Sequence, residues 1–225
     1  MGRREGFGAV LADGSARAAK AIGKGAEQFV MAVQGQELPM HDPRFEPGLA
    51  TTYVMDATPG RHTQGGEMNP PVGLEVGKWD RYQYEGKGDI HRKLSALMHV
   101  VNSAGTCMFA YLSYPFSYVP DFLAAVTGNE YSIEECYLVG ERIANIRHAF
   151  NIREGLNPLE FSFPNRMMGV PPLEHGNVRG VTVDYKQQWK DYFEAMDWDQ
   201  QTAKPSAKRL EALGLGYVAK ALGSV

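Results

Sequence analysis

Proline and glycine are spread unevenly along this chain, and their positions limit where a long helix can form. Proline lacks a backbone N–H donor and clashes with the preceding helical turn. Residues 156–184 are rich in both residue types, and residues 37–89 contain six prolines: Pro39, Pro43, Pro47, Pro59, Pro70 and Pro71. We therefore expect long, ordered loops in these two regions, and long helices only outside them.

The segment after the first proline-rich region predicts a helix that begins near Asp89. Its apolar residues recur at helical spacing: Ile90, Leu94, Leu97, Met98 and Val101. Asp89 is a suitable N-cap, because a carboxylate can accept a hydrogen bond from a free N–H of the first turn. The pattern predicts a helix with one buried face that ends at a turn over residues 102–107.

A longer helix is expected from Ser132 to about Ile152. Ser132 and Glu135 form a capping-box pattern, in which each side chain bonds to the backbone N–H of the other residue. Spacings of three and four residues predict a continuous buried stripe of Cys136, Val139, Ile143, Ile146 and Phe150. The charged residues are expected on a solvated face: Glu141, Arg142, Arg147, Arg153 and Glu154.

Shorter helices are expected at 14–22, 187–196 and 206–213, and residues 27–35 suit a strand or a buried extended segment. Regular strand–helix alternation and internal repeats are absent from the sequence. The predicted fold class is mostly α, a multihelical chain with long ordered Pro/Gly-rich loops. We expect residues 37–89 to form a long loop region of the kind found at active sites, residues 90–155 a helical core, and residues 156–225 a C-terminal wrap with terminal helices.

The composition disfavours several classes of partner. With 23 basic and 26 acidic residues the net charge is −3, so no positive field would recruit DNA, RNA or an anionic membrane. No run of about 18 apolar residues is present, and we expect no membrane span. Two cysteines in 225 residues make no disulfide framework, which favours a reducing compartment, the cytoplasm.

The two cysteines have different sequence contexts. Cys136 lies on the apolar stripe of the long helix, where a free cysteine acts as a small hydrophobic residue. Cys107 ends the stretch NSAGTC, directly after small, turn-prone residues. Backbone N–H groups at such a turn can bond to sulfur and favour the thiolate that a metal requires, but from the residues alone a structural role is equally consistent. A cubane iron–sulfur cluster needs four thiolates, more than this chain holds.

Two histidines stand in turn-rich loops. In QELPMHDPR, His41-Asp42 lies between two prolines and is a candidate acid/base pair. The alternative is a proline-braced loop in which Asp42 caps a turn and pairs with Arg44. In DATPGRHTQGG, residues 56–66, Gly60 allows a close backbone approach and precedes a cation and a titratable ring, Arg61-His62.

Four segments, in this order, resemble the C-terminal domains of the tungsten-dependent aldehyde:ferredoxin oxidoreductases. They are IGKGAEQFVMAVQGQELPMHDPR at 22–44, ATPGRHTQG at 57–65, NSAGTC at 102–107 and GERIANIRHAFNIREG at 140–155. The stretch YFEAMDWDQQTAKPSAKRLEALGL at 192–215 also resembles the closing segment of that family. Residues 1–225 are accordingly interpreted as the C-terminal helical region of such an enzyme.

The resemblance implies a role for the NSAGTC stretch. In the family, a D-x-x-G-L-C motif grips a pterin and ends in the fourth cysteine of a [4Fe–4S] cluster. Cys107 would then ligate the cluster, and the preceding turn would contact a pterin through Asn102, Ser103, Gly105 and Thr106. Asn102 stands where the motif has Asp, and Thr106 where it has Leu, so a neutral amide replaces a stronger charged acceptor.

The resemblance also implies cofactors that this chain would hold only in part. They are a tungsten (or molybdenum) bis-pterin and the [4Fe–4S] cluster. The family's N-terminal pterin domain, and the clustered cysteines that supply the other three cluster ligands, do not occur in the sequence. A missing N-terminal pterin-binding region or subunit is therefore the expected partner.

The chemistry of the family is the oxidation of an aldehyde to a carboxylic acid, with ferredoxin as the electron acceptor. By motif position His62 would move the proton, His41 is the second candidate, and Arg61 would orient a pterin phosphate or a developing carboxylate. The chain alone is expected to be inactive. The alternative is a non-catalytic helical interaction or scaffold protein derived from the same fold. A hydrolase built on His41-Asp42 is disfavoured, because no motif for an activated nucleophile accompanies the pair.

Overall fold

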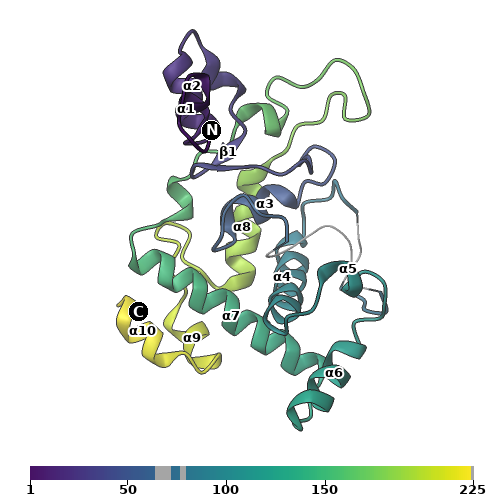
Figure 1. The fold of residues 1–225 in the computed structure, drawn as a ribbon. Coiled ribbons are helices and arrows are strands. Elements are labelled where there is room, and N and C mark those ends of the chain that lie inside the picture. The colour runs from purple at the N-terminus through teal and green to yellow at the C-terminus, as the bar shows by residue number, and fades with distance from the viewer. Residues whose placement is uncertain (64–71, 77–79, 224–225) are drawn as a thin grey trace.

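The computed structural model of the chain describes residues 1–63, 72–76 and 80–223. Within these ranges the chain is helical apart from loops and one two-stranded antiparallel hairpin, which confirms the predicted mostly α class (Figure 1). Pro70 and Pro71 lie outside the described residues, as does the end of the 57–65 segment, Gln64 and Gly65.

The elements follow one another in a simple order. They are α1 (Phe7–Leu11), α2 (Ser15–Ile22), η1 (Ala26–Phe29), β1 (Ala32–Val33), β2 (Gln36–Glu37), α3 (Leu49–Met55), α4 (Lys87–Ser103), α5 (Met108–Tyr111), α6 (Tyr118–Thr127), α7 (Ile133–Arg153), η2 (Pro158–Glu160), η3 (Asn165–Met168), α8 (Tyr185–Met196), α9 (Ala207–Ala212) and α10 (Gly216–Leu222). The predicted helices correspond to α2, α4, α7, α8 and α9, and residues 27–35 form η1 and β1 instead of one strand.

Helix α4 is the centre of the fold and packs against both α7 and α8. Two glycines allow these close contacts. A Cβ at Gly140 of α7 would overlap the carbonyl of Ala96 in α4, and a Cβ at Gly88 of α4 would overlap the carbonyl of Asp191 in α8. Glycine normally weakens a helix interior, so its presence here serves helix packing.

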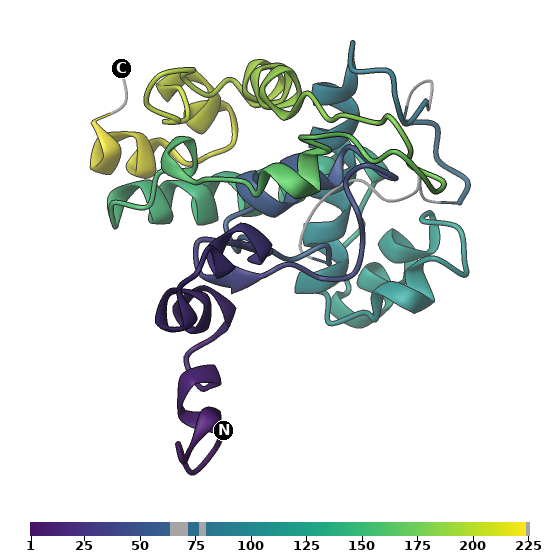
Figure 2. The same ribbon diagram turned by 90° about the horizontal axis from the view of Figure 1, so that it is seen from above.

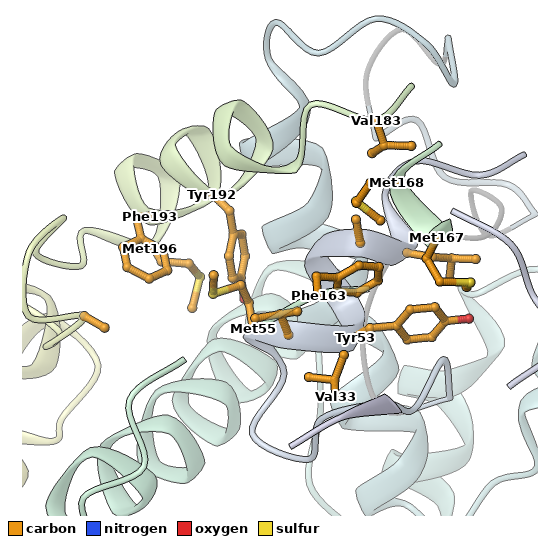
Figure 3. Packing of buried hydrophobic residues seen from close by; sticks show 14 of the residues in the cluster. Val33, Tyr53, Met55, Phe163, Met167, Met168, Val183, Tyr192, Phe193 and Met196 are labelled. Carbon is orange, nitrogen blue, oxygen red and sulfur yellow. The ribbon is translucent and has the colours of Figure 1, made fainter. Parts of the chain in front are cut away.

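The largest core cluster joins segments that are far apart in the sequence (Figure 3). Tyr53 and Met55 of α3 lie among Phe163, Met167 and Met168 from the η3 region and Tyr192, Phe193 and Met196 of α8. Helix α3 is short enough to fit between Pro47 and Pro59, and all seven of its residues are buried. The first proline-rich region therefore contributes to the core as well as to the loops.

Helix α4 buries the predicted apolar face: Ile90, Leu94, Leu97, Met98 and Val101. It begins at Lys87, and Gly86 occupies the N-cap position in place of the expected Asp89. Asp89 is therefore in the first turn and pairs with Arg92 and Lys93. The capping box of α7 is present as predicted, because Ser132 and Glu135 each accept the N–H of the other.

The buried face of α7 differs from the predicted stripe. Cys136 is buried, but Ile146 and Phe150 are exposed, and Val139 and Ile143 are half-buried. The residues that face the core are instead Cys136, Gly140, Glu141, Ala144, Asn145, His148 and Ala149.

The prediction of a solvated charged face is wrong for Glu141 and only partly right for Arg147. Glu141 is buried and forms ion pairs with Arg92 and Arg209, and Arg147 is half-buried. Asn145 accepts a hydrogen bond from the Trp198 indole at 2.8 Å. A charged or polar group can face the core when it has partners there, and these residues do.

The two ends of α7 carry different structures. Near its beginning, Val119 and Leu123 of α6 lie in one cluster with Ile133 and Tyr137. At its end, α9 and α10 pack around Ala149 and Ile152. Figure 1 shows α6 and α10 at these opposite ends, and in Figure 2 the N-terminal helices extend from the body as an arm.

Candidate functional site

The loop that follows α3, residues 56–63, is fixed by side chains from α7. Arg147 donates to the Thr58 hydroxyl at 2.6 Å, and Asn151 donates to the Ala57 carbonyl at 2.8 Å. Asp56 accepts the Thr58 N–H at 2.9 Å, which closes the first turn of the loop. These bonds fix the start of the loop and thereby define the position of the residues that follow it, up to Thr63.

A buried polar group lies beneath this loop. Arg147 lies 3.2 Å from Nδ1 of His99, and its guanidinium can only donate, so Nδ1 accepts and Nε2 carries the proton. That Nε2 lies 3.6 Å from the Asp56 carboxylate. Burial, with the charge of Arg147 second, lowers the pKa of His99 to about 3, whereas burial raises the pKa of Asp56 against the opposing charge of Arg147. His99 is therefore neutral at physiological pH.

The two predicted catalytic histidines are in contact. The ring centroids of His41 and His62 are 4.4 Å apart with an interplanar angle of 55°. The Tyr53 hydroxyl donates to the His41 carbonyl at 2.8 Å and anchors that loop to α3. Burial, and then the proximity of His41, lower the pKa of His62, so His62 is unprotonated at neutral pH and able to accept a proton.

The Asp42 carboxylate forms its hydrogen bond and ion pair with Arg44, and not with His41. Its carboxylate accepts the Arg44 backbone N–H at 2.9 Å and pairs with the guanidinium at 2.7 Å. Of the two interpretations of this loop, the capped turn with an Asp42–Arg44 pair is the one present. His41 therefore has His62, rather than its sequence neighbour, as its ring partner.

Arg61 is exposed on the same loop as His62. The preceding Gly60 has φ +73°, and its N–H donates to the Tyr53 carbonyl at 2.8 Å. A Cβ at this position would lie 2.8 Å from Cγ of Gln36. The close approach expected of Gly60 is thus made to the β2 segment of the chain itself.

The NSAGTC stretch ends α4 in a regular helix-terminating turn. Gly105 has φ +71°, its N–H donates to Asn102, and the N–H of Thr106 donates to Val101. These two bonds make a Schellman motif. They use the N–H groups of Gly105 and Thr106, so these two groups are already bonded within the turn. Cys107 is exposed, takes an extended conformation and occupies the N-cap position of α5.

One hydrogen bond joins this turn to the histidine loop. Nδ2 of Asn102 donates to the carbonyl of Thr63, the residue after His62, at 2.8 Å. Asn102, Ser103 and Gly105 are exposed and Thr106 is half-buried. The structure thus places the NSAGTC turn beside the His62 loop, although 39 positions separate Asn102 from Thr63 in the sequence.

The residues that fix the loop were not identified from the sequence. The loop is fixed by four side chains: Asp56, His99, Arg147 and Asn151. Of these, only His99 has an unusual position in the sequence. His91 and His99 are eight residues apart on the face of α4 that also carries its apolar stripe, an unusual place for two titratable rings. Both are buried.

Side chains that could bind a metal are not grouped in the part of the chain that the structure describes. Among the described residues, no three histidine, cysteine or acidic side chains gather closely enough to hold an ion. Cys136 is buried in the cluster around Leu97 and Phe116, and burial raises the pKa of its thiol, as suits a structural role. Cys107 is the exposed thiol.

The comparisons with known proteins identify the family. The family model described as aldehyde ferredoxin oxidoreductase, domains 2 and 3, matches residues 1–215. The chain belongs to this family. Its relatives include the tungsten-containing aldehyde ferredoxin oxidoreductases of Pyrococcus abyssi, 31% identical over 96% of this chain, and of Thermococcus kodakarensis, 29% identical over 94%. The chain spans about 35% of the length of these relatives.

A solved structure shows the same fold. The BamBC active site complex of benzoyl coenzyme A reductase, solved with 1,5-dienoyl-CoA, superposes with a TM-score of 0.67 over 97% of this chain and 38% of that one, at 21% sequence identity. The helical arrangement expected of the aldehyde ferredoxin oxidoreductase C-terminal domains is therefore present. Within the described part of the chain, no helix is both long and apolar enough to cross a membrane.

Proposed function

We propose that this chain is the C-terminal part of a tungsten- or molybdenum-pterin iron–sulfur oxidoreductase, which oxidises aldehydes to carboxylic acids and passes the electrons to ferredoxin. The observation that carries the proposal is the hydrogen bond from Asn102 to Thr63. It brings the cysteine turn and the histidine loop, two of the segments that resemble the family, into direct contact.

Cys107 supplies one thiolate to a [4Fe–4S] cluster in this proposal. Its side chain is exposed at the beginning of α5, so a second polypeptide can reach it. Such a cluster takes four thiolates, and Cys136 is buried elsewhere. The other three come from a pterin-binding N-terminal region or subunit. A reducing compartment such as the cytoplasm suits this role, because an exposed ligand thiol has to remain reduced.

The residues around Cys107 suit contacts to a pterin. Because Asn102 uses its amide N–H toward Thr63, its Oδ1 remains as an acceptor for pterin amino groups. Ser103 adds an exposed hydroxyl, and the exposed Gly105 and half-buried Thr106 complete the turn. Arg61 presents an exposed guanidinium on the neighbouring loop, which suits a phosphate or the product carboxylate.

His62 takes the proton in this proposal. Oxidation of an aldehyde and one water to a carboxylic acid releases two protons and two electrons. The bound metal–pterin group would supply the two-electron acceptor. His62 is half-buried and its pKa is lowered by burial, so its neutral ring can accept one of the protons near neutral pH. His41, in ring contact with it, is the second candidate.

The test uses the complex of this chain with the polypeptide from its own source that carries the pterin domain and three clustered cysteines. Aldehyde-dependent reduction of ferredoxin is measured for the wild type, His62→Ala and the control His175→Ala, which removes an exposed histidine from a different loop. We expect kcat to fall roughly 100-fold in His62→Ala and to stay unchanged in His175→Ala. The wild-type rate should decline on acidification only below the ordinary histidine pKa of about 6.5.

Two results would count against the proposal. If His62→Ala retained the wild-type kcat, His62 would not be the proton acceptor. If the wild-type complex were colourless and free of iron and tungsten or molybdenum, the chain would be the scaffold protein that we consider as the alternative.

A further inference from the structure

The chain carries little charge immediately after Cys107. Residues 107–128 contain one charged residue, Asp121, whereas 22% of the whole chain is charged. These residues form α5, a turn and α6. A segment with so few charges is expected in a core or in an interface that stays closed.

Of the side chains that the structure describes in this segment, only three are buried: Phe116, Val119 and Pro120. Phe116 and Val119 point into the cluster with Leu97, Met98 and Cys136. Large apolar side chains on both helices are exposed instead, and we call them together the α5–α6 face: Phe109, Leu112, Tyr118, Phe122 and Val126.

The α6 part of this face has a regular arrangement. Tyr118, Phe122 and Val126 are four residues apart and so share one side of α6. Tyr114, Tyr118 and Phe122 form a group of rings with centroids 5.9 to 6.2 Å apart. Phe109 remains 71% exposed and Val126 86% exposed. Several large apolar side chains gathered in this way are typical of a surface that binds another protein.

The position of this face indicates what covers it. Phe109 is two residues from Cys107, so their Cα atoms are at most about 8 Å apart. Whatever brings three thiolates to Cys107 has to lie against the beginning of α5. This chain covers 35% of the length of its relatives. The remaining part of a relative is therefore large enough to carry the other three cysteines and to cover this face.

We propose that the α5–α6 face binds the polypeptide that carries the other three cluster cysteines. This inference rests on the proposed function, because it takes Cys107 to be a cluster ligand. The near absence of charge favours a permanent interface with that polypeptide over a transient electron carrier, whose docking relies on charge.

Two substitutions place a charge on the face where the helices tolerate it. Phe109→Asp puts an acidic residue in the first turn of α5, and Val126→Lys puts a basic residue in the last turn of α6, both favourable toward the helix dipole. The matched control is Tyr217→Asp. Tyr217 is also an exposed aromatic residue in a helical first turn, at the far end of α7 on α10.

The complex with the cysteine-bearing polypeptide is examined by titration calorimetry and by size-exclusion chromatography, with circular dichroism to verify folding. We expect roughly tenfold weaker association or more for Phe109→Asp and Val126→Lys, and wild-type association for Tyr217→Asp. Iron content is measured on the same samples, and Cys107→Ser serves as a reference that should lose iron without losing association.

The other outcomes distinguish a failure of this inference from a failure of the proposed function. Wild-type association of both charged variants, with iron still bound, would refute the interface alone. A dimer of the isolated chain that Val126→Lys converts to monomer would assign the face to a second copy. Unchanged association but impaired ferredoxin reduction would assign it to the electron carrier. Association that depends on this face but yields no iron would uphold the interface and contradict the proposed function.

Discussion

At the scale of single residues, Asn102 makes a contact that an aspartate cannot make. Its amide donates to the Thr63 carbonyl, whereas a carboxylate has no hydrogen to donate. We expect Asn102→Asp to lose this bond and to lower the free energy of unfolding by about 1 kcal/mol, measured by urea titration. Ser103→Asp adds the same charge next to it and is the control. Equal effects of the two substitutions would mean that the bond to Thr63 contributes nothing.

A second residue-scale prediction concerns His148, which is buried. Its Nε2 donates to the Ala203 carbonyl at 2.7 Å, and its ring stacks on Trp198 with centroids 3.6 Å apart. Burial lowers its pKa to about 4, below the ordinary value of 6.5. The folded state therefore binds this proton less well than the unfolded state, and its stabilising effect is complete above pH 6.5 and declines as the pH falls toward 4.

This decline should amount to roughly 3 kcal/mol of unfolding free energy between pH 7 and 4 from His148 alone. In His148→Gln, which keeps an N–H donor, we expect a lower stability at pH 7 but a flatter dependence below pH 6.5. Chemical denaturation at several pH values gives both quantities. An unchanged slope would show that other groups cause the acid sensitivity.

At the scale of elements, the packing of α4 against α7 depends on Gly140. Alanine normally stabilises a helix interior relative to glycine by up to about 1 kcal/mol. Because a Cβ at Gly140 would overlap the Ala96 carbonyl, we expect Gly140→Ala to destabilise the chain by about 3 kcal/mol.

Gly216→Ala is the control for this prediction, since a Cβ there would meet Glu211 only at an ordinary contact distance of 3.8 Å. The midpoint temperature of unfolding should therefore fall strongly in Gly140→Ala and change little, or rise, in Gly216→Ala. If Gly140→Ala were as stable as the wild type, the two helices would not be in close contact at this residue.

Sequence patterns predicted α4 better than α7 for a physical reason. The core face of α4 carries most of its large apolar residues, so hydrophobic periodicity identifies that face. The core face of α7 includes Glu141, Asn145 and His148, whose partners come from distant elements. Hydrophobic periodicity assigns polar residues to the solvent, so it predicted a buried stripe that includes the exposed Ile146 and Phe150. Helix α6 has Pro120 in its first turn, where proline is tolerated, and it was not predicted.

The segments of the candidate site could be predicted from the sequence, but their arrangement in space could not. The family resemblance pointed to His41, His62 and Cys107 individually. Their arrangement depends on α4, which ends beside the 56–63 loop, and on Arg147 and Asn151 of α7, which fix that loop. These contacts link positions 39 to 94 residues apart, beyond the reach of local patterns. The Asp42–Arg44 pair, which is local, was anticipated as one of two alternatives.

At the scale of the whole molecule, several features of the chain fit the proposed cofactor site. They are the exposed Cys107, the Asn102 turn, the paired histidines and the apolar α5–α6 face, in a chain that spans 35% of the length of its relatives. We propose that they form one part of a cofactor site whose other part lies on another polypeptide.

Iron content of the purified complex tests that claim most directly. The complex of the chain with the cysteine-bearing polypeptide is prepared without oxygen, with wild-type Cys107 and with Cys107→Ser, and iron is measured per complex alongside its electron paramagnetic resonance spectrum. We predict four irons and a reduced-cluster signal for the wild type, and loss or clear alteration of both in Cys107→Ser while the two polypeptides remain associated. Equal iron content and identical spectra in the two complexes would contradict the account.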